Sequence, residues 1–236
     1  MKITWLGQGG YLIEQAGKRL AIDPYLSDAL AVKQGLRRLV PPPISVVDLS
    51  PDAVFITHDH LDHFDPETLE PLLRQSPKCP LAGPQSVVEH GRKMGIAEQR
   101  LISARLGESM QLQGFMLKPT PAKHSDPAAI GLLVETEGQV IYISGDTLYE
   151  PTLASRVRSL AGPRIDAAFV CMNGLLGNMN LTEATELVAA LEPAVAVPMH
   201  YGMFAENTAD PHAFAAACRT KNQNTQILEI GSSVEL

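Results

Sequence analysis

Short runs of apolar and β-branched residues, interrupted by glycine and proline, open the chain. They predict three strands at residues 3–6, 11–14 and 19–22, joined by glycine-containing turns. A short helix is predicted over residues 28–39. Pro41-Pro42-Pro43 must end that helix, because proline cannot donate a backbone hydrogen bond and restricts the residue before it.

Strand and helix patterns then alternate to the end of the chain. Strands are predicted at 53–57, near Leu81, and at 101–103, 110–112, 115–119, 130–135, 140–144, 166–171, 194–198 and 225–230. Helices are predicted from Asp65-Pro66 onward and over 84–94, 182–191 and 211–219, the third without a capping box at Thr182. Two sets of strands, each followed by helices, predict an α/β protein with two packed sheets and helices outside them. No change of composition marks a linker, so we expect one domain over residues 1–236.

The closest grouping of potential metal ligands in the sequence is the hexapeptide HDHLDH at residues 58–63, which follows an apolar predicted strand. In extended backbone, residues two apart point to the same side, so His58 and His60 can reach one metal ion together. The chain must then turn, which lets Asp62 and His63 address a second ion. A helical zinc motif would need histidines four apart. The pattern therefore predicts a two-metal site rather than a loop of solvated histidines.

Later predicted strands supply the further ligands that a two-metal site needs. His124, Asp146 and His200 each follow an apolar strand. Each residue alone is weak evidence for a metal ligand, because a lone histidine at a strand end is more often a hydrogen-bonded or surface residue and Gly-Asp-Thr is more often a turn or helix cap. With the hexapeptide, five of the seven histidines occupy such positions. The other two, His90 and His212, fall in predicted helices and are interpreted as structural or solvated.

The H-x-H-x-D-H motif, together with His124, Gly-Asp-Thr and Pro-Met-His, resembles the metallo-β-lactamase superfamily. The resemblance implies an αββα sandwich of two packed mixed β-sheets flanked by helices, with the metal site at one edge. It also implies two divalent metal ions, zinc first, with manganese or iron as alternatives. The implied ligands are His58, His60 and His124 on one ion, Asp62, His63 and His200 on the other, and Asp146 bridging both.

Three segments narrow the resemblance to the L-ascorbate-6-phosphate lactonase-like group. They are Asp23-Pro24-Tyr25-Leu26, residues 38–43, and Ala82-Gly83-Pro84 before a predicted helix. This similarity implies a binuclear hydrolase acting on a small, anionic lactone or ester. Flavodiiron-type members of the superfamily carry glutamate in place of His60, so this position favours hydrolysis over reduction of oxygen or nitric oxide.

The expected chemistry follows from the two ions, which lower the pKa of a bridging water so that it attacks as hydroxide near neutral pH. Asp62 is expected to bind metal and to accept the proton of the water. Asp23 and Asp59 are placed to accept hydrogen bonds from histidine N–H groups and so to orient the rings. The alternatives, equally consistent with the sequence, are that Asp23 forms a turn and that Asp59 is a solvated loop residue. Cys171 could ligate a metal, but a small buried core residue explains it better.

Substrate contacts are predicted at Asn173 and Tyr201, which follow strands that end at the metal edge, and at Arg38. Arg38 could pair with a phosphate or carboxylate, and a solvent-exposed position at a helix end is the alternative. The segments 28–43 and 173–180 are candidates for a substrate lid or are simply long connections.

Net charge, cysteine content and the lack of long apolar runs exclude some classes of function. A net charge of −7, from 19 basic and 26 acidic residues, argues against a nucleic-acid or anionic-membrane surface, but the charge of the metal ions still permits an anionic substrate. Three widely spaced cysteines, no apolar leader and no run of about 18 apolar residues predict a soluble, cytoplasmic protein. The hydrolase chemistry implies a small-molecule substrate as the partner, with no nucleic acid and no membrane. A phosphodiesterase acting on RNA or phospholipid, and a non-catalytic metal-binding module, remain the alternatives. The sequence does not indicate an oligomeric state.

Overall fold

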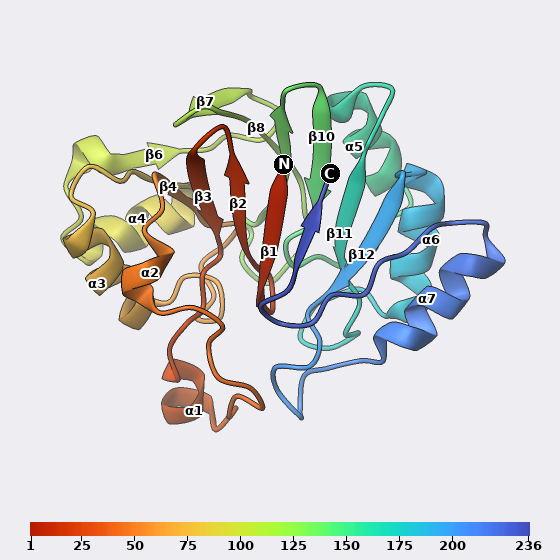
Figure 1. Ribbon diagram of the computed structural model, residues 1–236, viewed down its shortest axis with the longest axis horizontal. Helices are drawn as coiled ribbons and strands as arrows, with labels where there is room; N and C mark the ends of the chain where they lie inside the picture. Colours follow the sequence, from red (N-terminus) through yellow and green to blue (C-terminus); the bar gives the residue numbers. More distant parts are fainter.

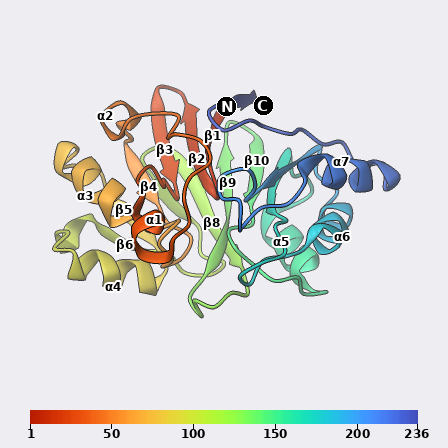
Figure 2. The ribbon, with the colours of Figure 1, turned by 90° about the horizontal axis from the view of Figure 1, so that it is seen from below.

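Two β-sheets pack face to face between two layers of helices in the computed structural model, which describes residues 1–236 (Figure 1). The first sheet holds seven strands and the second holds six. Figure 2 shows helices on both outer sides with the strands between them. The αββα sandwich of two mixed sheets is therefore confirmed.

The first sheet combines an antiparallel hairpin region with a parallel region. Its strands, in spatial order, are β13 (Ser233–Glu235), β1 (Lys2–Gly7), β2 (Gly10–Gln15), β3 (Lys18–Ile22), β4 (Ala53–Phe55), β5 (Leu81–Gly83) and β6 (Leu101–Ser103). The segments that connect them form α1 (Ala29–Gln34), α2 (Val46–Leu49), α3 (Pro66–Gln75), α4 (Gln85–Lys93) and the short 3₁₀ turn η1 (Glu98–Arg100). Pairing is antiparallel from β13 to β3 and parallel from β3 to β6.

The second sheet is also mixed. Its strands, in spatial order, are β12 (Val195–Met199), β11 (Ala167–Cys171), β10 (Gln139–Ile143), β9 (Ile130–Thr136), β8 (Phe115–Pro121) and β7 (Met110–Leu112). Its helices are α5 (Leu153–Ala161), α6 (Leu181–Leu191) and α7 (Pro211–Thr220). The longest helix has 11 residues, and none has both the length and the apolar character needed to cross a bilayer.

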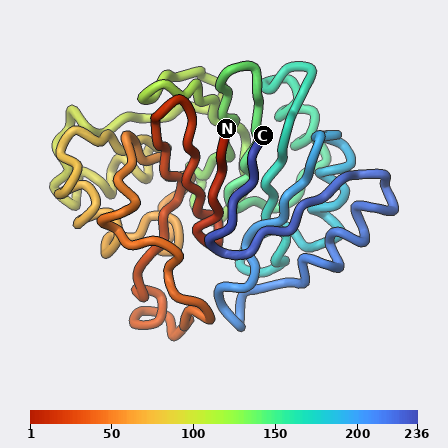
Figure 3. The backbone as a smooth tube through the Cα atoms, in the orientation of Figure 1, coloured from red at the N-terminus to blue at the C-terminus, as the bar shows by residue number.

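A core of 44 buried residues fills the space between the sheets and under α5 to α7. A second cluster of 14 residues lies beneath α2, α3 and α4. Burial alternates over the first four residues of β1, as expected of an antiparallel strand with one face covered. Every residue of β4 and β11 is buried, as expected of parallel strands covered on both faces. The two chain ends lie side by side (Figure 3), and the N-terminal amine donates to the carbonyl of Leu236.

Strand direction explains why the predicted site residues can meet. The antiparallel pairs β1–β2 and β2–β3 give β1 the direction of β3, and β8 has the direction of β10 for the same reason. The carboxyl ends of β1, β3 and β4 therefore share one edge of the first sheet, and those of β8, β10, β11 and β12 share one edge of the second. Turns that follow these ends can reach one another across the sandwich.

Several predicted elements differ from the structure. The helix expected at 28–39 ends at Gln34, because Gly35 takes a left-handed conformation and caps it. The run at 225–230 is not a strand. It makes only an isolated bridge from Thr225 to Ala196 before the chain crosses to the other sheet as β13.

Helix starts account for the other differences. The prediction that the helix over 182–191 lacks a capping box is wrong, because Asn180 and Glu183 form one. Two helices were not predicted, α2 and α5. The N-cap of α5 is Thr152, whose side chain makes no capping hydrogen bond.

Candidate metal centre

Four turns bring imidazole and carboxylate groups together at the shared edge of the two sheets. The turn after β4 carries His58, His60, Asp62 and His63, and the turns after β8, β10 and β12 carry His124, Asp146 and His200. Within these turns, three groups have ligand atoms that lie within 4.8 Å of one another. The groups are His58/His60/His124, Asp62/His63/His200 and His58/His63/Asp146.

The first group supplies three ligand atoms, and a tetrahedral metal site has four. His60 Nδ1 lies 3.1 Å from His58 Nε2 and 3.1 Å from His124 Nε2. Metal–nitrogen bonds of about 2.0–2.1 Å at tetrahedral angles place neighbouring ligand nitrogens about 3.3 Å apart. These two separations are therefore close to the spacing of ligand nitrogens around a zinc ion.

The second group is joined to the first by Asp146. Asp146 Oδ2 lies 3.2 Å from His200 Nε2, 3.5 Å from His63 Nε2 and 3.9 Å from His124 Nε2. Asp62 Oδ2 lies 3.6 Å from His200 Nε2 and 3.8 Å from His63 Nε2. One carboxylate thus faces ligands of both groups, which is the position that a bridging ligand needs.

Two buried polar atoms of this cluster have no hydrogen-bond partner, His63 Nε2 and Asp146 Oδ1. An unpaired buried polar atom is costly, and a bound ion is one of the few things that satisfies it. The donor set of imidazoles and carboxylates is also the one that zinc accepts. The residues therefore fit two divalent ions.

Hydrogen bonds to the opposite ring nitrogen fix the orientation of His58 and His63. The Thr57 hydroxyl donates to Asp23 Oδ2 at 2.6 Å, so its lone pair accepts from His58 Nδ1 at 2.9 Å. The same Asp23 Oδ2 accepts from His63 Nδ1 at 2.8 Å. Both rings thus donate through Nδ1 and turn Nε2 toward the site.

The remaining rings of the first group are fixed in a similar way. The carbonyl of Gly177 lies 3.0 Å from His124 Nδ1, and a carbonyl can only accept, so the His124 proton is on Nδ1. His60 has the opposite arrangement, with Nε2 beside the Ser125 hydroxyl at 3.1 Å and Nδ1 toward the site. Three different loops therefore hold the rings in position.

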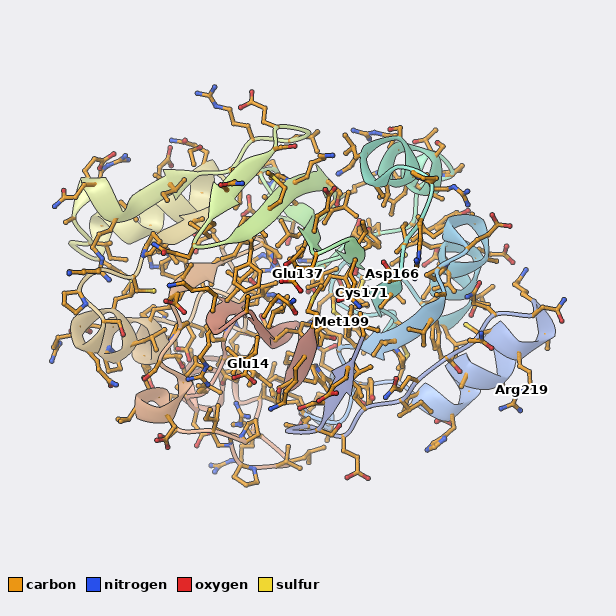
Figure 4. The ribbon with its side chains drawn as sticks, turned by 45° about the horizontal axis from the view of Figure 1, so that its top comes forward. Glu14, Glu137, Asp166, Cys171, Met199 and Arg219 are labelled. Atoms are coloured by element: carbon orange, nitrogen blue, oxygen red, sulfur yellow. The ribbon has the colours of Figure 1, made fainter.

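The predicted orienting carboxylates have different partners. Asp23 contacts His63, a member of the cluster, whereas Asp59 lies 2.6 Å from Nδ1 of His90, which is outside the three groups. His90 stacks on Phe64 with ring centroids 4.0 Å apart, which is a structural role. Cys171 is fully buried between the sheets and pairs with Met199 across β11 and β12 (Figure 4), as expected of a core residue.

Three polar residues of the centre were not recognised in the sequence. Gln8 Nε2 donates to Asp62 Oδ2 at 3.1 Å, and Asn178 Nδ2 donates to Asp146 Oδ2 at 2.9 Å. Asp126 accepts from the backbone N–H of Asp59 and from the Ser86 hydroxyl, which ties the hexapeptide to the His124 turn. The one sequence feature that could have indicated Gln8 and Asn178 is that they follow the strands β1 and β11.

Unusual backbone conformations also concentrate here. Gln8, Asp23, Leu176 and His200 have φ angles of +49°, +43°, +53° and +69°. Left-handed conformations are unfavourable for residues with a Cβ, and they cluster at functional sites. The neighbouring Gly9 is required for space, because a Cβ there would lie 2.7 Å from His63 Cε1.

The carboxylates and imidazoles shift one another's pKa strongly when no metal is bound. Burial alone would lower the pKa of His200, but Asp146 and Asp62 raise it to about 9. His63 behaves similarly, because Asp146, Asp62 and Asp23 outweigh burial and raise its pKa well above the usual value. Burial and the neighbouring His63 lower the pKa of His58. The centre therefore holds both protonated and neutral imidazoles before metal binds.

A cavity of about 430 Å³ opens onto this centre. Its wall contains cluster residues together with Gln34, Asp59, Leu61, Ser125, Leu176 and Asn207. None of the three predicted substrate contacts is in the wall. Asn173 lies behind it and donates to Asn207 Oδ1 at 2.6 Å. Gln34 and Leu176 belong to the two segments that were expected as candidate lids.

Arg38 and Tyr201 are engaged elsewhere. The Arg38 guanidinium lies over the Tyr25 ring and donates to the carbonyls of Tyr25 and Val40. The Tyr201 hydroxyl donates to the carbonyl of Leu228, and its ring packs on Trp5 at 4.6 Å. The structure therefore does not bring either side chain to the cavity.

Comparison with known proteins agrees with this geometry. A family model described as "Beta-lactamase superfamily domain" matches residues 18–201. A UPF0173 metal-dependent hydrolase of Pyrobaculum aerophilum is 30% identical over 221 residues, covering 92% of this chain and 91% of that protein. A UPF0173 metal-dependent hydrolase of Methanosarcina mazei is 27% identical and covers 100% of this chain and 99% of that protein.

A solved structure is similar over nearly the whole chain. Igni18, a metallo hydrolase from the archaeon Ignicoccus hospitalis, superposes with a TM-score of 0.80 at 25% identity, covering 99% of this chain and 97% of that one. The sequence match, the αββα fold and the His/Asp groups at its edge all agree. The chain therefore belongs to the UPF0173 metal-dependent hydrolase family of the metallo-β-lactamase superfamily.

Proposed function

We propose that this protein is a binuclear metal-dependent hydrolase that cleaves a small lactone or ester. The observation that carries the proposal is that two three-residue ligand groups share a single edge and are linked by Asp146. His58, His60 and His124 would hold one ion, and Asp62, His63 and His200 the other. Zinc suits this donor set best, with manganese or iron as alternatives.

When bound, two divalent ions supply a water of lowered pKa and polarise the substrate oxygen. The chain's own residues prepare the reaction. Asp23 and the Gly177 carbonyl orient the histidines, so little reorganisation is needed when the substrate arrives. The wall of the cavity positions the substrate next to the ligand groups.

Asp62 is placed to take up the proton of the attacking water. Its side chain is 17% exposed, against 6% for Asp146, so it is the more accessible of the two ligand carboxylates. Gln8 donates to one of its oxygens and fixes the carboxylate plane. Asp62 would therefore have two roles, metal binding and proton transfer.

The wall composition bears on any phosphate that the metal ions do not hold. No lysine or arginine lines the cavity, so such a phosphate would have no cationic side chain as its partner. This wall gives no support for the phosphate group that the lactonase-like resemblance would imply. A non-catalytic module is less consistent with seven suitable side chains, since a disused site would be expected to lose ligands.

A substrate panel tests the proposal. Zinc-loaded protein should hydrolyse lactones or p-nitrophenyl esters, and Asp146→Ala should reduce kcat/KM by about 10³-fold or more, because it removes the link between the two groups. Bis-(p-nitrophenyl) phosphate and thioesters serve as comparison substrates. Unchanged activity in Asp146→Ala, or activity on the phosphodiester alone, would contradict the proposal.

A further inference from the structure

The wall of the metal cavity is mostly polar. Two apolar residues, Leu61 and Leu176, line it beside the ligand residues and the polar side chains of Gln34, Asp59, Ser125 and Asn207. Leu176 is 71% exposed at the mouth of this cavity. A large apolar side chain that lines a binding cavity and is exposed is available for contact with the apolar part of a ligand.

The backbone at Leu176 has an unfavourable conformation. Its φ of +53° is unfavourable for a residue with a Cβ. On either side of it, the Asn178 N–H donates to the Leu175 carbonyl, and the Gly177 carbonyl accepts from His124. Asn178 also donates to Asp146. The loop that carries Leu176 is therefore fixed to His124 of the first group and to Asp146, which links the two groups.

Charge in the cavity does not favour an anionic substrate tail. Three carboxylates line the wall, from Asp59, Asp62 and Asp146, and they offset most of the charge that two divalent ions would bring. Two cations near the cavity are engaged by other groups. Lys123 pairs with Glu150 at 2.9 Å, and Arg38 donates to backbone carbonyls. Neither side chain lines the cavity.

We infer that the part of the substrate that does not react is uncharged and apolar, and that Leu61 and Leu176 contact it. This inference rests on the proposed function and revises the expectation of an anionic substrate. Leu176 is then a residue that determines specificity, because truncating it removes apolar contact without removing a metal ligand.

Calorimetry with metal-chelating hydroxamates tests this inference without requiring turnover. The probes are hexanohydroxamic acid, its equally long carboxylate-ended analogue adipic acid monohydroxamate, and acetohydroxamic acid, which has no tail. Zinc-loaded protein should bind the hexano compound about tenfold more tightly than the adipic compound. Leu176→Ala should lower the affinity for the hexano compound about fivefold and the affinity for acetohydroxamic acid by less than about twofold.

Two further variants sharpen the test. Leu106→Ala is the matched control, since Leu106 is 51% exposed and does not line this cavity, and it should change none of the affinities. Leu176→Lys should reverse the preference toward the adipic compound. Equal or tighter binding of the adipic compound by the unmodified protein would overturn the inference, as would equal losses for all three probes in Leu176→Ala. Preference for the hexano compound without hydrolysis of any ester, lactone or thioester would instead contradict the proposed function alone.

Discussion

Asp23 and His63 form a fully buried pair, in which the carboxylate oxygen Oδ2 lies 2.8 Å from ring nitrogen Nδ1. Asp23 follows β3 and His63 ends the hexapeptide after the neighbouring strand β4, so the parallel pairing of these strands brings them together. The same oxygen accepts the Thr57 hydroxyl, which in turn contacts His58. One carboxylate thus orients two histidines that belong to different ligand groups.

Replacing Asp23 should therefore weaken metal binding at both positions. Asp23→Asn keeps the shape of the side chain but removes its charge, and we expect zinc affinity to fall about 10- to 100-fold, as measured by competition with a chelating dye. Glu70→Gln, on the exposed face of α3, is the control for loss of one acidic group and should have no effect. Unchanged affinity in Asp23→Asn would show that the pair serves folding only.

Gln8 should affect metal binding and stability in different ways. Gln8→Met keeps the length of the side chain but removes the donor to Asp62, so zinc affinity should fall about tenfold. It also removes the buried and unpartnered Oε1, so the metal-free protein should keep its thermal midpoint or gain a little. Gln15→Met, at the other end of β2, is the control. A large loss of stability without loss of affinity would contradict the assigned role.

Metal binding should release protons at neutral pH. His200 has a pKa raised to about 9 and the pKa of His63 is also raised, so both rings are protonated at pH 7 in the metal-free protein. Zinc must displace those protons, and its apparent affinity should rise with pH up to about 9. Calorimetry in buffers of different ionisation enthalpy measures the release. Affinity that does not change between pH 6 and 9 would argue against this coupling.

The same shifts predict how the metal-free protein responds to alkali. A raised folded-state pKa contributes stability that is fully present below the unfolded value of about 6.5 and is lost as pH rises through the folded value. The thermal midpoint of the metal-free protein should therefore fall between about pH 7 and 10, and that of the zinc-loaded protein should fall less. Equal behaviour of the two forms would contradict this prediction.

The three cysteines should be unreactive in the folded protein. Burial raises the pKa of Cys79 and Cys171 to about 12 and that of Cys218 to about 11, so little thiolate is present at pH 8. A thiol reagent should titrate all three only after denaturation. Fast reaction of one thiol in the native protein would show that its site opens.

The sequence was most informative where chemistry and strand pattern coincide. His124, Asp146 and His200 could be selected because each follows an apolar strand, and the structure brings all three to the hexapeptide. Local signals also predicted α3 and α7 well, since Asp65 and Asp210 both cap their helices before a proline. Helix α5 lacks such a cap and was missed.

Residues that act through long-range contacts could not be predicted. Gln8 meets Asp62, and Asn178 meets Asp146, only because two separate sheets align their edges. Arg38 had the right chemistry for an anion, but its local backbone carbonyls and the Tyr25 ring engage it. A charged side chain in a sequence gives no information about which of these partners it will have.

Metal stoichiometry tests the central claim most directly. Purified protein loaded with zinc and freed of excess metal should contain close to two ions per chain by elemental analysis. His124→Ala should reduce this to about one, because it removes one ligand of the first group and none of the second. A single ion in the unmodified protein, or none, would contradict the binuclear centre.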